Sequence, residues 1–210
     1  PGHIHQKYSA QIRRMVQLKF LAGVARRSAA DIGTTSMPPV QGVLGKLASD
    51  AAVVEALVCG MEASGELHGD AYMPNRHLVY AAQVFTQELY AGFITAIRDL
   101  AGGALVMLPS SAQDYANPDL AGLLDRLQQS PAMAPRERVK FLKLAADALI
   151  SDFAGRHAQY EMFYAGAQFV TRGHSFRTYD WEGAGALVDG LLEGYDLEQS
   201  ILPVSTRQIA

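Results

Sequence analysis

The residues of this chain that could carry chemistry lie in three places, of which the first is the pair His3 and His5. Side chains two residues apart share one face of an extended strand and can chelate a metal there, whereas at the start of a helix they point in different directions. The sequence has no P-loop, no GxGxxG, no HExxH, no GxSxG and no cysteine pair at metal spacing. We therefore expect neither a metal site nor a self-contained active site built on a short motif.

The second place is the passage GGALVMLPSSAQDY, which begins at Gly102 and Gly103. Its glycines, together with Pro109, Ser110 and Ser111, offer bare backbone N–H groups and hydroxyls. A loop of this kind can approach a phosphate or a ribose closely. The alternative is a simple connection between two helices, and the residues alone leave both interpretations open.

The third place is the segment YAGAQ, which follows a stretch rich in aromatic and charged residues. Ala165, Gly166 and Ala167 are small enough for a flat or phosphorylated ligand to touch the backbone, and Gln168 could supply an amide. Tyr164 and the aromatic residues before it are spaced as in a helix, and such residues are more often core than cofactor contacts. Composition does not decide between a binding turn and a packed one.

The composition narrows the class of protein. Hydrophobic residues make up 49% and charged residues 19% of the 210, which is typical of a folded globular domain. Scattered basic residues, 18 Lys and Arg against 21 Asp and Glu, indicate neither a nucleic-acid nor a membrane partner. Cys59 is the single cysteine and cannot form an internal disulfide, which favours a reduced, cytoplasmic setting. We expect a soluble protein without a signal peptide.

Hydrophobic spacing of three and four residues predicts the helices that must position these three places. Four of them are long, and shorter ones are expected around 120–127 and at 183–195. The long helices are predicted over residues 4–32, 40–65, 75–102 and 135–155. Gly33 ends the first of them, Asn75 caps the third, and the stretch GELHGDAYMPN between the second and third is predicted to be a loop.

Loops too short for sheet crossovers predict an all-α fold, an up-down four-helix bundle with a short C-terminal helical appendage. We expect residues 1–157 to form the bundle. Residues 158–210 would then be the remainder of the same domain: a turn, a short helix and a C-terminal extension. The predicted core includes eight apolar side chains: Phe20, Leu47, Val54, Phe85, Leu89, Leu142, Leu149 and Phe153.

Three stretches resemble the C-terminal domain of the 4-hydroxyphenylacetate 3-hydroxylase family. They are the opening Q-x6-R-x5-KFLAG pattern, which begins at Gln6, then DLAGGALVMLPSSAQDYANPDL, and then ISDFAGRHAQYEMFYAGAQ. The resemblance runs from about residue 3 to about residue 196. It implies the fold of the acyl-CoA dehydrogenase C-terminal four-helix bundle, the third part of a larger subunit that assembles as a homodimer or homotetramer.

The resemblance also implies an activity. Members are oxygenase components of two-component monooxygenases that hydroxylate phenols and chlorophenols. They use FAD as FADH2, supplied by a separate flavin reductase, and O2, through a C4a-hydroperoxyflavin. The protein positions the phenol, helps to deprotonate it and excludes water. We expect the 210-residue piece to be inactive without the rest of such a subunit.

The resemblance assigns roles to residues already noted. It places the Gly102–Ser111 passage near the flavin or its subunit boundary, and the Tyr164–Gln168 turn near the FAD phosphates and ribose. It makes His5 the histidine that faces the flavin or the substrate, with His3 and Gln6 as neighbouring alternatives.

A related branch, 4-hydroxybutyryl-CoA dehydratase, pairs this histidine with a cysteine seven residues later as iron–sulfur ligands. Ile12 and Ala10 stand seven residues after His5 and His3, so that reading is disfavoured. The remaining alternative from another class is a non-catalytic bundle that serves binding or oligomerisation.

Overall fold

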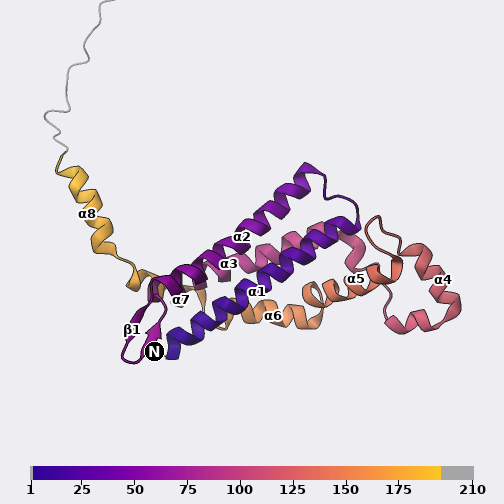
Figure 1. The fold of residues 1–210 in the computed structure, drawn as a ribbon, viewed down its shortest axis with the longest axis horizontal. Helices are drawn as coiled ribbons and strands as arrows, with labels where there is room; N and C mark the ends of the chain where they lie inside the picture. The colour runs from indigo at the N-terminus through magenta and orange to yellow at the C-terminus, as the bar shows by residue number, and fades with distance from the viewer. Residues whose placement is uncertain (1, 195–210) are drawn as a thin grey trace, which may run out of the picture.

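The computed structural model describes residues 2–194, and almost all of their regular structure is helical. The body of the molecule consists of three long helices, α1 (Gly2–Asp31), α2 (Pro38–Ala63) and α3 (Arg76–Ala101), which pack against one another along their lengths (Figure 1). Successive helices run in opposite directions because the connections between them are short. The predicted all-α fold is confirmed, and these three predicted helices lie where the spacing put them.

The ends of the long helices follow from local chemistry. Gly33 adopts a φ of 73° directly after α1, and Thr34 N–H bonds back to the carbonyl of Ala29 at 2.9 Å, which closes the helix. At the start of α3 the Asn75 side chain accepts a hydrogen bond from the N–H of Leu78 at 3.0 Å, as predicted for a capping residue.

The stretch between α2 and α3 is a β-hairpin rather than the predicted open loop. Strand β1 (Glu66–His68) pairs antiparallel with β2 (Ala71–Met73), and Gly69 takes a φ of 65° in the turn between them. Three-residue strands are too short to show a period of two in the sequence, which is why the pattern did not reveal them.

The fourth side of the bundle is formed by two helices, where the sequence predicted one. Helix α5 (Pro135–Leu149) is followed by Ile150 as its C-terminal cap, and a new helix, α6 (Asp152–Phe163), begins with Ser151 as its N-terminal cap. The Ser151 hydroxyl accepts the N–H of Ala154 at 3.1 Å, and a serine that caps a helix start competes with helix continuation. The prediction of one long helix over 135–155 is therefore wrong.

The passage from α3 to α5 is short helical turns at one end of the bundle. It contains two 3₁₀ turns, η1 (Gly102–Leu105) and η2 (Ala112–Ala116), followed by α4 (Pro118–Leu127). Figure 1 shows α4 at the end of the molecule opposite the hairpin and the start of α1. The predicted short helix around 120–127 is confirmed.

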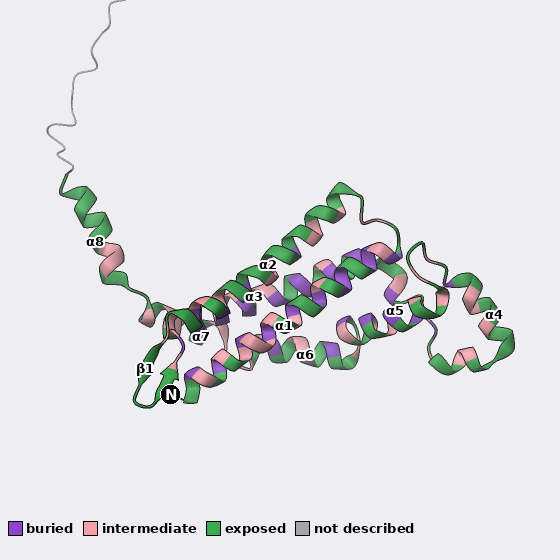
Figure 2. Ribbon diagram, in the orientation of Figure 1, coloured by how far each residue is buried: buried purple, intermediate pink, exposed green. Residues whose placement is uncertain are grey.

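Buried residues lie along α1, α3 and α5, as the colouring of the ribbon shows (Figure 2). One cluster fills the middle of the bundle and a smaller one lies toward the hairpin. The fully buried members of the middle cluster include Leu18, Val54, Phe93, Ile97, Leu142 and Leu149. The smaller cluster consists of Ile4, Met61, Val79, Tyr80 and Ala82.

Of the predicted core, Leu47, Val54, Leu142 and Leu149 are buried, and Phe85 and Leu89 pack partly buried against them. Two assignments are wrong, because Phe20 is 45% and Phe153 is 59% exposed. Phe153 lies beyond the break at Ser151, so the new helix no longer continues the inward stripe of α5. Phe20 lies at the margin of α1 beside a shallow surface cleft.

Two further helices follow α6. Helix α7 (Gln168–Thr178), which the sequence did not predict, packs against α3, and α8 (Trp181–Leu192) corresponds to the predicted helix at 183–195. Helix α8 has no buried residue and projects away from the bundle (Figure 1). The predicted C-terminal extension beyond residue 194 lies outside the described residues. Among those described, no helix is long and apolar enough to cross a membrane.

Candidate functional site

The α6–α7 turn, Tyr164–Gln168, lies against α1 and α3 and is held from inside the bundle. Lys7 on α1 donates from Nζ to the carbonyl of Ala165 at 3.2 Å. Gln87 on α3 donates from Nε2 to the carbonyls of Met162 at 2.8 Å and Gly166 at 3.1 Å. Three carbonyls around the turn are therefore fixed toward the interior by two side chains from two helices.

The conformation of this turn depends on glycine. Gly166 has a φ of 104°, a region that L side chains rarely adopt, and a Cβ there would lie 3.9 Å from Val170. The backbone, rather than lack of space, requires the glycine. Helix α7 then begins at Gln168 without a side-chain cap, and no acceptor for the N–H groups of Ala167, Gln168 and Phe169 occurs in residues 2–194.

Behind the turn, charged side chains converge on Glu161, which is fully buried in α6. Its carboxylate accepts hydrogen bonds from Arg13, at 2.9 Å from Nη2, and from Arg14, and His157 Nε2 lies 3.0 Å from it. Arg14 is also buried, with its guanidinium over the ring of Tyr90. This cluster ties the end of α6 to α1, and so it fixes where the turn begins.

Burial shifts the proton affinities in this cluster. Burial is the main cause that lowers the pKa of His157, and Arg13 and Arg14 lower it further against the opposing effect of Glu161. The imidazole is therefore neutral at neutral pH. Burial likewise raises the pKa of Tyr164, so that its phenol keeps its proton. Two arginines, Arg13 and Arg14, thus pair with the single carboxylate of Glu161 just before the turn.

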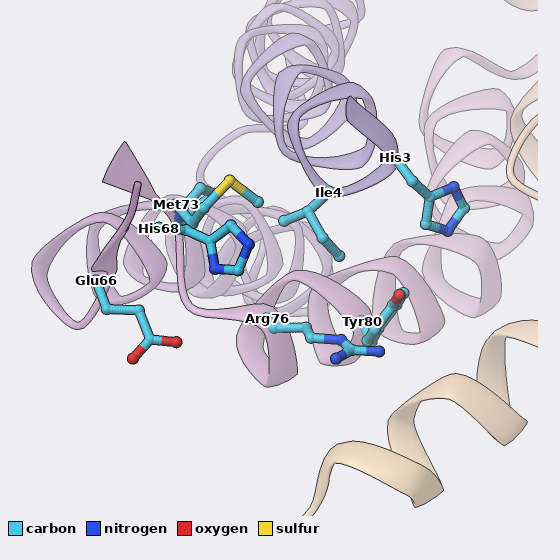
Figure 3. Close-up of a pocket in the computed structure, with 8 residues that line it drawn as sticks. His3, Ile4, Glu66, His68, Met73, Arg76 and Tyr80 are labelled. Atoms are coloured by element: carbon cyan, nitrogen blue, oxygen red, sulfur yellow. The ribbon is translucent and has the colours of Figure 1, made fainter. Parts of the chain in front are cut away.

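A cleft of about 470 Å³ opens where α1 begins (Figure 3). It lies between the start of α1, the hairpin and the start of α3, and Figure 3 shows His68 and Met73 facing Ile4, with Arg76 and Tyr80 on the α3 side. His3 lies at its rim. The full lining is His3, Ile4, Glu66, His68, Met73, Pro74, Arg76 and Tyr80.

Aromatic rings connect this cleft to α7. The rings of Tyr80 and His174 stack with centroids 4.8 Å apart and an interplanar angle of 10°, and His3 lies 5.9 Å from His174. Burial is the largest cause that lowers the pKa of both His3 and His174, and Lys7 adds to it. Both imidazoles are therefore neutral at neutral pH, and each has a ring nitrogen that can accept a proton.

The predicted site residues are only partly brought together. His5 lies on α1, half-buried, and is not among the residues that line the cleft, whereas His3 is. The α6–α7 turn contacts Gln87, but Gly102 lies fifteen residues further along α3. At ~1.5 Å per residue this places the two predicted cofactor segments about 22 Å apart along the helix axis. Within one chain, the two segments therefore do not form a single site.

The Gly102–Ser111 passage has less free hydrogen-bonding capacity than its sequence suggests. Gly102 and Gly103 are exposed and open η1, with Gly102 at a φ of 53°, but Pro109 is buried. The Ser111 hydroxyl accepts the N–H of Gln113 at 3.0 Å and caps η2. The Ser110 hydroxyl donates to Asp114 at 3.4 Å. The N–H of Gly102 bonds to the carbonyl of Arg98, and the Gly103 carbonyl accepts the N–H groups of Val106 and Met107 at 3.0 Å. The two glycines are therefore exposed, but part of their backbone hydrogen-bonding capacity is used within the chain.

Sequence reasoning missed the side chains that hold the turn. Lys7, Gln83 and Gln87 are polar residues at positions where the helical spacing calls for apolar ones, and each is buried. A search for apolar periodicity passes over such positions. The available signal was the set of polar interruptions within two otherwise amphipathic helices.

Residues 2–193 match the family model described as 4-hydroxyphenylacetate 3-hydroxylase C terminal. The chain is 31% identical over 183 residues to the 4-hydroxyphenylacetate 3-monooxygenase oxygenase component of Pseudomonas aeruginosa, with 86% of this chain and 35% of that protein covered. It is 30% identical over 184 residues to the 4-nitrophenol 2-monooxygenase oxygenase component of a Rhodococcus species, with 86% and 35% covered.

Among solved structures, the fold is similar to the oxygenase component of 4-hydroxyphenylacetate 3-monooxygenase complexed with FAD and 4-hydroxyphenylacetate. The TM-score is 0.86 at 22% identity, over 91% of this chain and 40% of that one. The chain spans about a third of the length of the curated relatives it matches.

Proposed function

Because the chain belongs to the 4-hydroxyphenylacetate 3-hydroxylase family and matches its C-terminal part, we propose that it forms the helical C-terminal part of an oxygenase component. The oxygenase would hydroxylate a phenolic substrate with O2 and with FADH2 delivered by a separate flavin reductase. The observation that carries this proposal is the family match over residues 2–193. Relatives named for 4-hydroxyphenylacetate and 4-nitrophenol support a phenol as the substrate class.

The α6–α7 turn fits the cofactor that this function requires. The N–H groups of Ala167, Gln168 and Phe169 have no acceptor in residues 2–194 and can donate to phosphate or ring oxygens, and Gly166 lets the backbone approach them. We therefore assign Tyr164–Gln168 to the binding of FAD. Reduced FAD supplies the electrons with which one atom of O2 is transferred to the ring.

Gly102 and Gly103 are also proposed to bind FAD, but they lie at the other end of α3 from the α6–α7 turn. A separation of about 22 Å along α3 is too large for both segments to surround one ring system in one chain. We assign the glycine segment either to the far end of the cofactor or to the cofactor of a second copy. The second assignment agrees with a homodimer or homotetramer, in which the FAD site lies at a subunit boundary.

For proton transfer we propose a histidine at the start of α1, with His5 as the assigned residue and His3 as its competitor. A neutral imidazole near the substrate can draw the phenol proton and increase electron density in the ring. Burial and the nearby Lys7 lower the pKa of His3, which supports a neutral base at this end of the bundle. A cytoplasmic setting completes the proposal, since a single cysteine favours a reducing compartment.

The test is a turnover assay with the full-length gene product, a flavin reductase, FAD and NADH. The panel contains 4-hydroxyphenylacetate, 4-nitrophenol and a chlorophenol, with benzoate as a control that lacks the hydroxyl. Hydroxylated product from at least one phenol and none from benzoate supports the proposal. If the protein binds no FAD and converts no phenol, the bundle serves instead as a binding or oligomerisation scaffold.

A further inference from the structure

We propose that Lys7 and Gln87 are positioning residues that aim the α6–α7 turn at the cofactor. Neither residue takes part in covalent chemistry. Both hold backbone carbonyls of the turn so that the neighbouring N–H groups of the turn face outward. The inference rests on the proposed function, because it specifies how this chain presents its FAD-binding turn.

Lys7 is the less expected of the two. It is only 4% exposed, and its Nζ donates to Ala165 O at 3.2 Å and to Gln83 Oε1 at 2.9 Å. No carboxylate lies within ion-pair distance of it in the described part of the chain, and burial lowers its pKa. A buried ammonium without a carboxylate partner costs stability that an uncharged methionine of similar shape would not. Packing alone therefore gives no reason for a lysine here.

Gln87 connects both helices that border the turn. It is 2% exposed, and its Nε2 donates to the carbonyls of Met162 and Gly166. Its Oε1 accepts the hydroxyl of Thr171 on α7 at 2.8 Å. One amide thus fixes the end of α6, the turn itself and the first turn of α7 relative to α3.

The consequence follows from peptide geometry. In a trans peptide the C=O and the next N–H point in opposite directions. Because the Gly166 carbonyl points inward to Gln87, the N–H of Ala167 points outward. It joins the N–H groups of Gln168 and Phe169, which lie at the positive end of α7 and have no acceptor in the described residues 2–194. The Lys7 charge behind the turn strengthens the attraction for an anionic or oxygen-rich group, as phosphates and flavin carbonyls are.

The experiment compares Lys7→Met and Gln87→Met with Val79→Ala in the full-length protein. Val79 is fully buried on α3 in the same small cluster as Tyr80, whose ring centroid lies 5.9 Å from Lys7 Nζ, and its side chain forms no hydrogen bond to the turn. Val79→Ala therefore reports a loss of packing alone. Reduced FAD is titrated anaerobically into each protein, and thermal unfolding is measured without FAD.

We expect each methionine variant to bind reduced FAD at least ten-fold more weakly than the wild type. Val79→Ala should bind within two-fold of the wild type even where it lowers the unfolding temperature more than the methionine variants do. Binding within two-fold by either folded methionine variant would overturn that residue's role. If Val79→Ala weakened the binding of reduced FAD equally, the effect would come from lost stability in general, and the proposed roles of both Lys7 and Gln87 would be overturned. A wild-type protein that binds no FAD refutes the proposed function itself, which is a different result.

Discussion

Glu161 is the residue on which the inner charges of the bundle converge. It is fully buried, Arg14 is 1% exposed, and both lie between α1 and α6. Such a pair need not add stability relative to apolar residues, but removal of one partner leaves the other charge buried and unpaired. The cluster therefore specifies how α6 sits on α1 more than it strengthens the fold.

Glu161→Gln tests this at the residue scale. The amide cannot balance the Arg14 charge, so the free energy of unfolding of the chain should fall by about 3–5 kcal/mol, measured by urea denaturation. The matched control is Glu137→Gln, which removes an exposed contact with Lys140 and an exposed negative charge in the first turn of α5 and should cost less than about 1 kcal/mol. Equal effects of both substitutions would contradict a structural role for the buried cluster.

The assignment of the histidine is a second prediction at this scale. In the full-length enzyme, His5→Ala should lower phenol hydroxylation while hydrogen peroxide release continues. Loss of the base slows attack by the ring without preventing consumption of O2. His3→Ala is the matched comparison, because His3 lines the cleft and His5 does not. If the ratio of product to O2 consumed falls only in His3→Ala, the base is His3 and the assignment of His5 is wrong.

At the scale of elements, α8 is the exposed helix at the end of the described chain, and none of its residues is buried. Among its exposed apolar side chains, Leu187 is 76% and Leu191 is 78% exposed, and these two stand one turn apart on one face. Apolar surface of this kind marks an interaction site in proteins that remain soluble. In the homo-oligomer proposed above, a second copy of the chain would cover this apolar face of α8.

The prediction is that Leu187→Glu combined with Leu191→Glu lowers the oligomeric state of the full-length protein, as measured by light scattering at micromolar concentration. Far-ultraviolet circular dichroism should be unchanged, because α8 contributes no buried residue to the bundle. Glu182→Gln with Asp189→Asn on the same helix serves as a control that alters charge without touching the apolar side chains. An unchanged mass for the leucine variant, or a monomeric wild type, would contradict the prediction.

At the scale of the whole molecule, the bundle has two hydrophobic clusters of its own, whereas most residues of the two segments proposed to bind the cofactor are at least partly exposed. Most of a large cofactor's surface must be covered for tight binding. The segments Gly102–Ser111 and Tyr164–Gln168 supply at most one side of such a site. Folding and cofactor binding should therefore separate when this chain is studied alone.

We expect the 210-residue chain to unfold cooperatively yet to bind reduced FAD only at micromolar or weaker affinity and to hydroxylate no phenol. The measurement is an anaerobic titration of reduced FAD into the chain and into the full-length protein under the same conditions. Stoichiometric binding or phenol turnover by the chain alone would overturn the proposal that it is one part of a larger catalyst.

The sequence alone was sufficient for the all-α class, for the bounds of α1, α2 and α3, and for the family. Helical periodicity depends on residues three and four positions apart, and caps such as Asn75 and glycines such as Gly33 act on the adjoining helix turn. These features can therefore be recognised from the nearby sequence alone. The motifs around Gly102 and Gly166 indicated where a cofactor would touch the chain. Their roles in binding remain predictions.

Only the tertiary structure decided how those motifs are held and how far apart they lie. The break at Ser151 turned Phe153 outward, because a capping serine can start a new helix where the apolar pattern continues. Lys7 lies 158 positions from the residue of the turn to which it donates, and Gln87 lies 75 and 79 positions from its two acceptors. Contacts at such separations depend on how whole helices pack, which no local pattern encodes.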